Sequence, residues 1–286
     1  MKTLKKGSKN ADVKFLQQSL AKLGYVISVD GIFGNDTERT VIRFQNDNDL
    51  SPDGVVGSNT WAVLTDLTSV RPAPVFGIDV SHHNGAINWN NINQSQVNFV
   101  YCKATQGRWF RDPMLHSNMN ELKRLNFIRG VYHFFTFKDV TAAEQVNNLL
   151  GTGIDFSQPG TLPPVLDVEW QQSNSLNQYI KDNQALCAQK VQAWLAGIEA
   201  ATGRKPLIYT NRFFWQDYMG NPPGFDSYLL WVASYRNDEP RLPEGWNDYA
   251  IWQFTESASV QGIPGNVDKN VFNGSVADLR KLALLG

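Results

Sequence analysis

Two acidic residues close the apolar segment PPVLDVEWQ, which covers residues 163–171. Asp167 and Glu169 stand two residues apart, with Val168 between them. Alternate side chains of a β-strand point to the same face and lie roughly 6.6 Å apart along it, so the two carboxyl groups share a face. Crowding raises the pKa of at least one of them, which leaves a proton donor beside a charged partner. Such a pair can protonate the leaving oxygen of a glycosidic bond and stabilise the charge that develops on the sugar.

Further polar and aromatic side chains end neighbouring apolar segments. Asp79 lies in FGIDVS (76–81) and Asp268 in GNVDKN (265–270), although a turn or cap role is the simpler alternative for each. Lys103 lies within an apolar segment, where its charge needs an acidic partner. We therefore expect it to pair with these acids, and it is a candidate substrate-binding residue. Aromatic rings stack on sugar rings and polar tips bind hydroxyl groups, although barrel cores also use tyrosine. The remaining binding candidates are Tyr132, Phe134, Tyr209, Tyr235, Trp252 and Gln253.

Adjacent histidines, His82 and His83, raise the alternative of a zinc amidase or peptidase. Neighbouring residues of a strand point to opposite faces, so the two rings could hardly share one ion. The sequence also contains no HExxH motif, in which two histidines on one helix face bind zinc. We therefore expect neither a metal nor a cofactor.

Seven apolar segments after residue 75 indicate buried strands: 76–81, 97–105, 129–136, 163–170, 205–211, 228–235 and 248–255. The stretches between them predict helices over 114–125, 142–150 and 176–201. Buried strands that alternate with helices are typical of a parallel sheet or barrel. We therefore expect an α/β domain over 76–286, an irregular, TIM-like β/α barrel in which loops or hairpins join the last strands. The carboxyl ends of strands form the active-site rim of such barrels, and the acids fall at these ends.

A short repeat precedes this domain. DGIFGNDT (30–37) and DGVVGSNT (53–60) share the pattern Asp-Gly-apolar-apolar-Gly-x-x-Thr, with a period of 53 − 30 = 23 residues. Each copy joins a glycine-rich turn to a helix start. Apolar spacing predicts helices over 12–23, 36–46 and 59–67. We expect a three-helix module over 1–67 and a linker over 68–75 that its prolines stiffen.

This amino-terminal part resembles the peptidoglycan-binding domain 1 family. The resemblance covers residues 3–67 and rests on LKKGSKNADVKFLQQSLAKLGY, VDGIFGNDTERTVIRFQ and PDGVVGSNTWAVL. That family is a three-helix cell-wall-targeting module, so the resemblance implies that the module binds bacterial peptidoglycan. A helical dimerisation or spacer module is the alternative.

Eight barrel segments resemble glycoside hydrolase family 25, the Chalaropsis-type lysozymes, and follow in family order: FGIDVSHHNGAINW, FVYCKATQG, GVYHFF, PPVLDVEW, PLIYTN, LWVASY, IWQFT and GNVDKNVF. The resemblance implies a muramidase that cleaves the β-1,4 bond between N-acetylmuramic acid and N-acetylglucosamine. It implies that Glu169 is the general acid and that Asp167 orients the substrate's acetamido group, the internal nucleophile. Asp79 and Asp268 would complete the acidic floor. Gln106, in KATQG, replaces a glutamate common in the family. Spacing alone leaves the stereochemistry open.

Composition limits the partners of the chain. A formal net charge of −1 favours neither nucleic acid nor a membrane surface. Cys102 and Cys187 lie in apolar stretches and are expected to be buried free thiols.

No secretory signal opens the sequence. We expect a monomeric phage endolysin that stays in the host cytoplasm until a holin releases it to the periplasm and cell wall. A bacterial autolysin, an exported interbacterial weapon and a barrel that binds glycans without cutting them are the alternatives.

Overall fold

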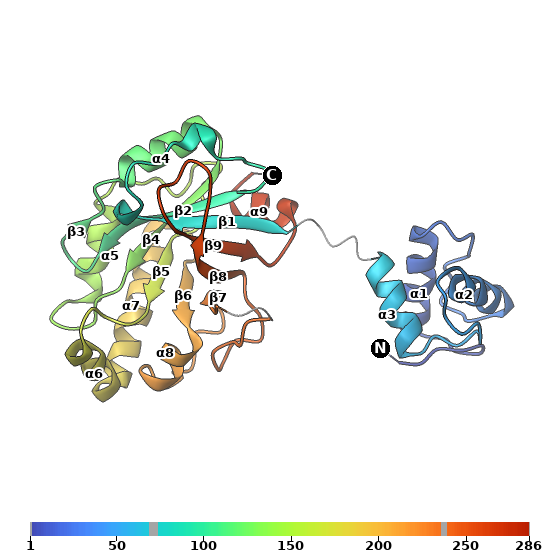
Figure 1. Cartoon of the computed structure of the whole chain (residues 1–286). Helices are drawn as coiled ribbons and strands as arrows, with labels where there is room; N and C mark the ends of the chain where they lie inside the picture. The colour runs from blue at the N-terminus through green and yellow to red at the C-terminus, as the bar shows by residue number, and fades with distance from the viewer. Residues whose placement is uncertain (1, 69–73, 236–238, 286) are drawn as a thin grey trace. The chain divides into compact units, whose positions relative to one another are not determined.

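The structure, a computed structural model, describes residues 2–68, 74–235 and 239–285. The chain divides into two compact units, Met1–Pro72 and Ala73–Gly286 (Figure 1). Of the linker predicted over 68–75, residues 69–73 lie outside the described residues. Within the described ranges, no helix has the length and apolar character that a membrane crossing requires.

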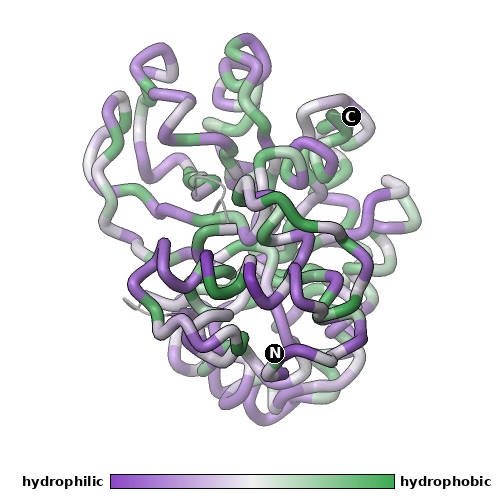
Figure 2. The backbone as a smooth tube through the Cα atoms, turned by 90° about the vertical axis from the view of Figure 1, so that its right-hand side faces the viewer, coloured by the Kyte–Doolittle hydropathy of each residue, from purple (hydrophilic) through white to green (hydrophobic). Residues whose placement is uncertain are grey.

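Three helices build the first unit, as predicted: α1 (Ala11–Lys22), α2 (Asn35–Asp47) and α3 (Ser58–Thr68). Asn10 caps α1, because its side chain accepts a hydrogen bond from the backbone N–H of Val13. Apolar and polar residues alternate along these helices (Figure 2). Their apolar sides meet in one buried cluster, in which Leu16, Val41 and Phe44 are almost fully covered.

One buried glutamine closes the turn of each repeat. Nε2 of Gln17 lies 2.8 Å from Oδ1 of Asp30, 3.0 Å from the Ile32 carbonyl and 3.1 Å from Oγ1 of Thr37, and its Oε1 accepts from Gly31 N. In the second copy, Gln45 makes the same four contacts, with Asp53, Val55, Thr60 and Gly54. Gly31 and Gly54 have φ of +76° and +71°, a region that favours glycine. Each repeat therefore contains a turn with a glycine in the left-handed region, and the glutamine of the preceding helix stabilises this turn by hydrogen bonds.

A closed barrel forms the second unit. Its strands are β1 (Val75–Val80), β2 (Phe99–Gln106), β3 (Phe110–Arg111), β4 (Ile128–Phe134), β5 (Val165–Val168), β6 (Leu207–Asn211), β7 (Leu229–Ala233), β8 (Ile251–Ala258) and β9 (Val267–Phe272). They follow the order β1-β9-β8-β7-β6-β5-β4-β2-β3, and pairing of β1 with β2 closes the sheet. The pairs are parallel except where β9 inserts antiparallel between β8 and β1 and where β3 folds back on β2. The expected irregular barrel with a hairpin at its end is therefore confirmed.

The helices of this unit are α4 (Leu115–Arg124), α5 (Ala142–Leu150), α6 (Asn174–Asp182), α7 (Gln184–Thr202), α8 (Arg212–Asp217) and α9 (Val276–Leu282). The single helix predicted over 176–201 is wrong, because α6 and α7 are separate. Asn183 divides them at φ −130° and ψ 36°, and its Nδ2 donates to the Tyr179 carbonyl (2.8 Å). An asparagine side chain that binds nearby backbone in this way competes with helix continuation.

Strand alternation sorts the barrel into an inner and an outer core. Inward residues at the strand starts, such as Val75, Phe99 and Val165, fill the amino-terminal end of the barrel. Gly130 leaves room there, since a Cβ on it would collide with the ring of Tyr101. Outward residues pack under the helices, and both cysteines are buried free thiols, as predicted. The carboxyl end of the barrel is left to polar side chains.

Candidate active site

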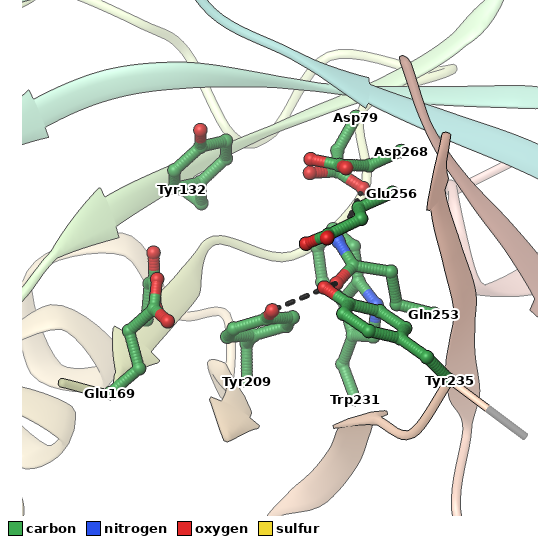
Figure 3. A pocket seen from close by; sticks show the side chains of 10 residues that line it. Asp79, Tyr132, Glu169, Tyr209, Trp231, Tyr235, Gln253, Glu256 and Asp268 are labelled. Carbon is green, nitrogen blue, oxygen red and sulfur yellow. Dashed lines mark hydrogen bonds between the residues drawn. The ribbon is translucent and has the colours of Figure 1, made fainter. Parts of the chain in front are cut away.

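A pocket of about 220 Å³ opens at the carboxyl end of the barrel (Figure 3). The structure brings together in it all four acids that the sequence singles out, together with all three predicted tyrosines and Gln253. Its lining is Asp79, Tyr132, Asp167, Glu169, Tyr209, Trp231, Tyr235, Gln253, Glu256 and Asp268. Glu169 stands on one side of the pocket, and Asp79, Asp268 and Glu256 stand on the other (Figure 3).

Asp167 and Glu169 form the first acidic pair. Asp167 belongs to β5 and is buried, and burial, together with the charge of Glu169, raises its pKa well above the ordinary value. Its Oδ1 has no hydrogen-bond partner among the described residues. Burial raises the pKa of Glu169 to about 7, against the opposing charge of Lys103. A carboxyl group with this pKa is protonated in a large fraction of molecules near neutral pH, which suits a proton donor.

Asp79 and Asp268 form the second acidic pair. Oδ2 of Asp79 accepts hydrogen bonds from Nε2 of Gln253 (3.0 Å) and Nδ2 of Asn270 (2.8 Å). Burial raises the pKa of Asp79, and these two amide donors oppose the rise. Burial and the charge of Asp79 raise the pKa of Asp268 to about 8. The two amide donors therefore favour the charged form of Asp79, and the raised pKa of Asp268 favours the proton on that side of the pair.

Gln253 ties this acidic pair to two tyrosines. Its Oε1 accepts a hydrogen bond from the hydroxyl of Tyr209 (2.9 Å) and from that of Tyr235 (2.9 Å) (Figure 3). Burial raises the pKa of both phenols, so they remain neutral donors. The network holds polar groups on the pocket wall where sugar hydroxyls can bind.

Lys103 and Phe134, predicted to bind substrate, are not among the residues that line the pocket. Nζ of Lys103 donates to Oε1 of Gln106 (2.9 Å) and lies 4.9 Å from the centre of the Phe134 ring. Burial lowers the pKa of Lys103, and the charges of Asp167 and other nearby acids oppose this. Lys103 therefore acts on the acids through its charge, and within the described residues its hydrogen-bond partner is Gln106 and not an acid.

Trp252, also predicted to bind substrate, is not among the residues that line the pocket. It follows the outward face of β8, packs against the outer core and donates from Nε1 to the Ser234 carbonyl (2.7 Å). Its neighbour Gln253 points inward, because adjacent strand residues alternate. Of these two residues, Gln253 lines the pocket and Trp252 does not.

The sequence analysis did not predict two of the residues that line the pocket, Trp231 and Glu256. Trp231 lies in register with Tyr209 on the neighbouring strand, and its Nε1 donates to Oδ1 of Asn270 (2.9 Å). Alternation along the segment 228–235, counted back from the predicted Tyr235, could have found it. Glu256 could not be found in this way, because register shifts in β8 on both sides of Thr255 break the two-residue period.

The adjacent histidines do not sit in a strand, so the expectation that they face opposite ways is wrong. Ser81 caps a short 3₁₀ turn over His82–Asn84, and the rings of His82 and His83 lie 3.9 Å apart between centres. Nδ1 of His82 lies 2.7 Å from Oδ2 of the buried Asp112. This contact fixes the loop after β1 beside the hairpin of β2 and β3.

Known proteins share this architecture. Residues 78–263 match the glycosyl hydrolases family 25, and residues 9–64 match the peptidoglycan binding domain family. Lysozyme M1 of Streptomyces globisporus is 33% identical over 227 residues, which cover 76% of this chain and 75% of that protein. N,O-diacetylmuramidase of Chalaropsis sp is 31% identical over 219 residues, 73% of this chain and 99% of that protein.

A solved structure extends the likeness to three dimensions. The bacterial lysozyme from Streptomyces coelicolor superposes with a TM-score of 0.70 at 31% identity, over 75% of this chain and 99% of that one. The family match, residues 78–263, contains every residue that lines the acid pocket except Asp268. The chain belongs to glycosyl hydrolases family 25, and it is a glycosidase.

Proposed function

We propose that the chain is an N-acetylmuramidase, which hydrolyses the β-1,4 bond between N-acetylmuramic acid and N-acetylglucosamine in bacterial peptidoglycan. The observation that carries the proposal is the pairing of Glu169, with a pKa of about 7, with the buried Asp167 at one wall of a pocket whose opposite wall holds Asp79 and Asp268. The relatives named as a lysozyme and a muramidase support the choice of substrate.

The proposed reaction uses these groups in two steps. Glu169 donates its proton to the glycosidic oxygen as the bond from C1 to that oxygen breaks, while the acetamido oxygen of the muramic sugar attacks C1. Glu169 then takes a proton from the water that opens the resulting ring at C1, which restores the acid and retains the configuration. Oδ1 of Asp167, which has no donor among the residues that the structure describes, accepts from the acetamido N–H and orients it. The charge of Asp79 stabilises the positive sugar.

Release of new reducing ends from purified peptidoglycan tests the proposal. Wild type is expected to release them and Glu169→Gln to lose the activity by about 10²–10⁴-fold, the usual contribution of a general acid. Mass spectrometry of the products separates muramidase from glucosaminidase and amidase. A barrel that binds glycans without cutting them would show no difference between wild type and Glu169→Gln.

We also propose that the amino-terminal module carries the chain to the wall. Its match to the peptidoglycan binding domain family supports this role. Deletion of residues 1–67 is expected to weaken pull-down on purified cell walls while short soluble glycans are still cleaved. Unchanged wall binding after the deletion would favour the spacer or dimerisation alternative.

The biological setting is a separate proposal. We infer a monomeric phage endolysin that acts on the wall after a holin releases it from the host cytoplasm. A wall-binding unit and a cleaving unit in one chain support lysis, but they serve an autolysin or an exported weapon equally. Holin and tail genes beside the coding sequence would support the phage setting, and cell lysis without any holin when the chain is expressed alone would contradict it.

A further inference from the structure

A second cavity, of about 490 Å³, lies between the hairpin of β2 and β3 and helix α5. Its lining is Arg108, Trp109, Arg111, Glu144, Asn147 and Asn148. None of these residues lines the acid pocket or takes part in the proposed reaction. Two guanidinium groups face one carboxylate, so this hairpin pocket is positive, whereas the neighbouring active site is strongly acidic.

The hairpin pocket is built rigidly. Asn148, only 5% exposed, donates from Nδ2 to the carbonyls of Gly107 (2.9 Å) and Phe110 (3.0 Å). Its Oδ1 accepts from Nε of Arg111 (3.2 Å). The guanidinium of Arg111 lies over Gly151, where a Cβ would collide with Nη2. The side chain of Arg111 is thus fixed at Nε, and its Nη groups have no hydrogen-bond partner in the ranges that the structure describes.

Trp109 is the most exposed large apolar side chain of the barrel unit, at 79%. Cζ of Arg108 lies 5.5 Å from the centre of its ring, and Nη1 of Arg108 lies 3.4 Å from Oε1 of Glu144. A half-exposed ion pair of this length holds the guanidinium only weakly. An exposed tryptophan beside arginine forks suits a ligand that carries both flat amide groups and carboxylates.

Strand register places the hairpin pocket near the reaction centre. Gln106, at the end of β2, pairs with Phe134 of β4, and Phe134 pairs with Asp167 of β5. Two strand spacings separate Gln106 from Asp167, which is roughly 10 Å. Arg108 and Trp109 follow Gln106 directly, so a substituent a few bonds long on a sugar above Asp167 can reach them.

Resting on the function proposed above, we propose that the hairpin pocket binds the carboxylate groups of the stem peptide that a muramic acid residue carries beside the cleaved bond. The arginine forks take the peptide carboxylates, and Trp109 packs against the peptide backbone. The pocket makes the barrel selective for glycan whose stem peptides are charged.

Two soluble tetrasaccharides test this selectivity in the full-length chain. Both carry stem tetrapeptides, and they differ only in whether the peptide carboxylates are free or amidated. Wild type is expected to cleave the free form with about tenfold higher kcat/KM, as one or two charge-assisted hydrogen bonds would give. Because cleavage occurs only in the barrel, the ratio of the two kcat/KM values excludes any contribution from the amino-terminal module.

Three variants divide the contributions, and a fourth serves as the control. Arg108→Gln with Arg111→Gln is expected to bring the ratio close to one, and the corresponding double lysine variant to keep part of it, since it retains charge without the fork. Trp109→Ala should lower kcat/KM for both substrates. Arg124→Gln, an exposed arginine of α4 that pairs with Glu121, should keep the wild-type ratio. A wild-type ratio of one, or a ratio that survives in the double glutamine variant, would overturn the inference. Failure of wild type to cleave either tetrasaccharide would instead count against the proposed function.

Discussion

Asp79 and Asp268 face each other as direct partners across the antiparallel pair of β1 and β9, although 189 positions (268 − 79) separate them in the sequence. Both side chains reach the acid pocket, and Asn270, two residues along β9, donates to Asp79 from the same face. The pair shares one proton because the amide donors stabilise the charged form of Asp79. A protonated Asp268 lets two carboxyl groups lie together without facing two charges.

The shared proton makes the stability of the barrel depend on pH. The pKa of Asp268 is about 8 in the fold and 3.8 ordinarily, so between these values the folded state binds a proton that the unfolded state lacks. The free energy of unfolding therefore decreases as pH rises through this window. Asp268→Asn is expected to make the fall of Tm between pH 5 and 8 shallower, by a few degrees at about 2–4 °C per kcal/mol. Scanning calorimetry measures it, with the exposed Asp226→Asn as control; an identical slope in Asp268→Asn and wild type would contradict the shared proton.

The general acid sets the alkaline limit of activity. Because Glu169 must be protonated to donate and its pKa is about 7, kcat/KM should fall as pH rises through about 7. The charge of Lys103 opposes this raised pKa, so Lys103→Met should move the alkaline limb upward by about half to one pH unit. pH–rate profiles on soluble glycan measure the shift, and the exposed Lys123→Met serves as control. A limb that stays in place or moves to lower pH would show that Lys103 does not act on Glu169.

Opposite faces of β8 should respond differently to substitution. Gln253→Leu leaves two tyrosine hydroxyls without their acceptor and takes one donor from Asp79, which should cost about 1–3 kcal/mol and lower kcat/KM. Trp252→Leu removes packing against the outer core and should cost ~2 kcal/mol of stability with little change in KM. Urea unfolding and steady-state kinetics of both variants separate the effects. A larger rise of KM in Trp252→Leu would restore that residue to the binding site.

Alternation and strand ends were sufficient to predict most of the acid pocket. The period of two puts Asp167 and Glu169 on one face, and the parallel barrel collects Asp79 and Tyr209 at the same end. The same rule, applied strictly, excludes Trp252. Its inclusion as a binding residue came from its aromatic type, which outer cores also use.

The remaining differences depend on contacts that a single sequence does not display. Glu256 reaches the pocket through register shifts in β8, and such shifts depend on the partner strand β9. Asn183 ends α6 through a side-chain contact inside an otherwise continuous helical pattern. The histidines of the β1 loop follow a capped 3₁₀ turn rather than the strand before it. In each case, one local hydrogen bond or strand pairing overrides the periodic pattern of the sequence.

The two buried glutamines of the amino-terminal module should contribute equally to its stability, because they make the same contacts in the two repeats. Gln17→Leu and Gln45→Leu each leave buried hydroxyl and amide groups unpaired, so each should reduce the free energy of unfolding of the module by about 1–3 kcal/mol. Gln18→Leu, at an exposed neighbouring position of α1, should change it by less than ~0.5 kcal/mol. Denaturant dependence of hydrogen exchange at the Gly31 and Gly54 amides measures these changes in the full-length chain. If either buried variant changed the free energy of unfolding as little as Gln18→Leu does, the glutamine contacts would not stabilise the turn. The glycines alone would then account for its conformation.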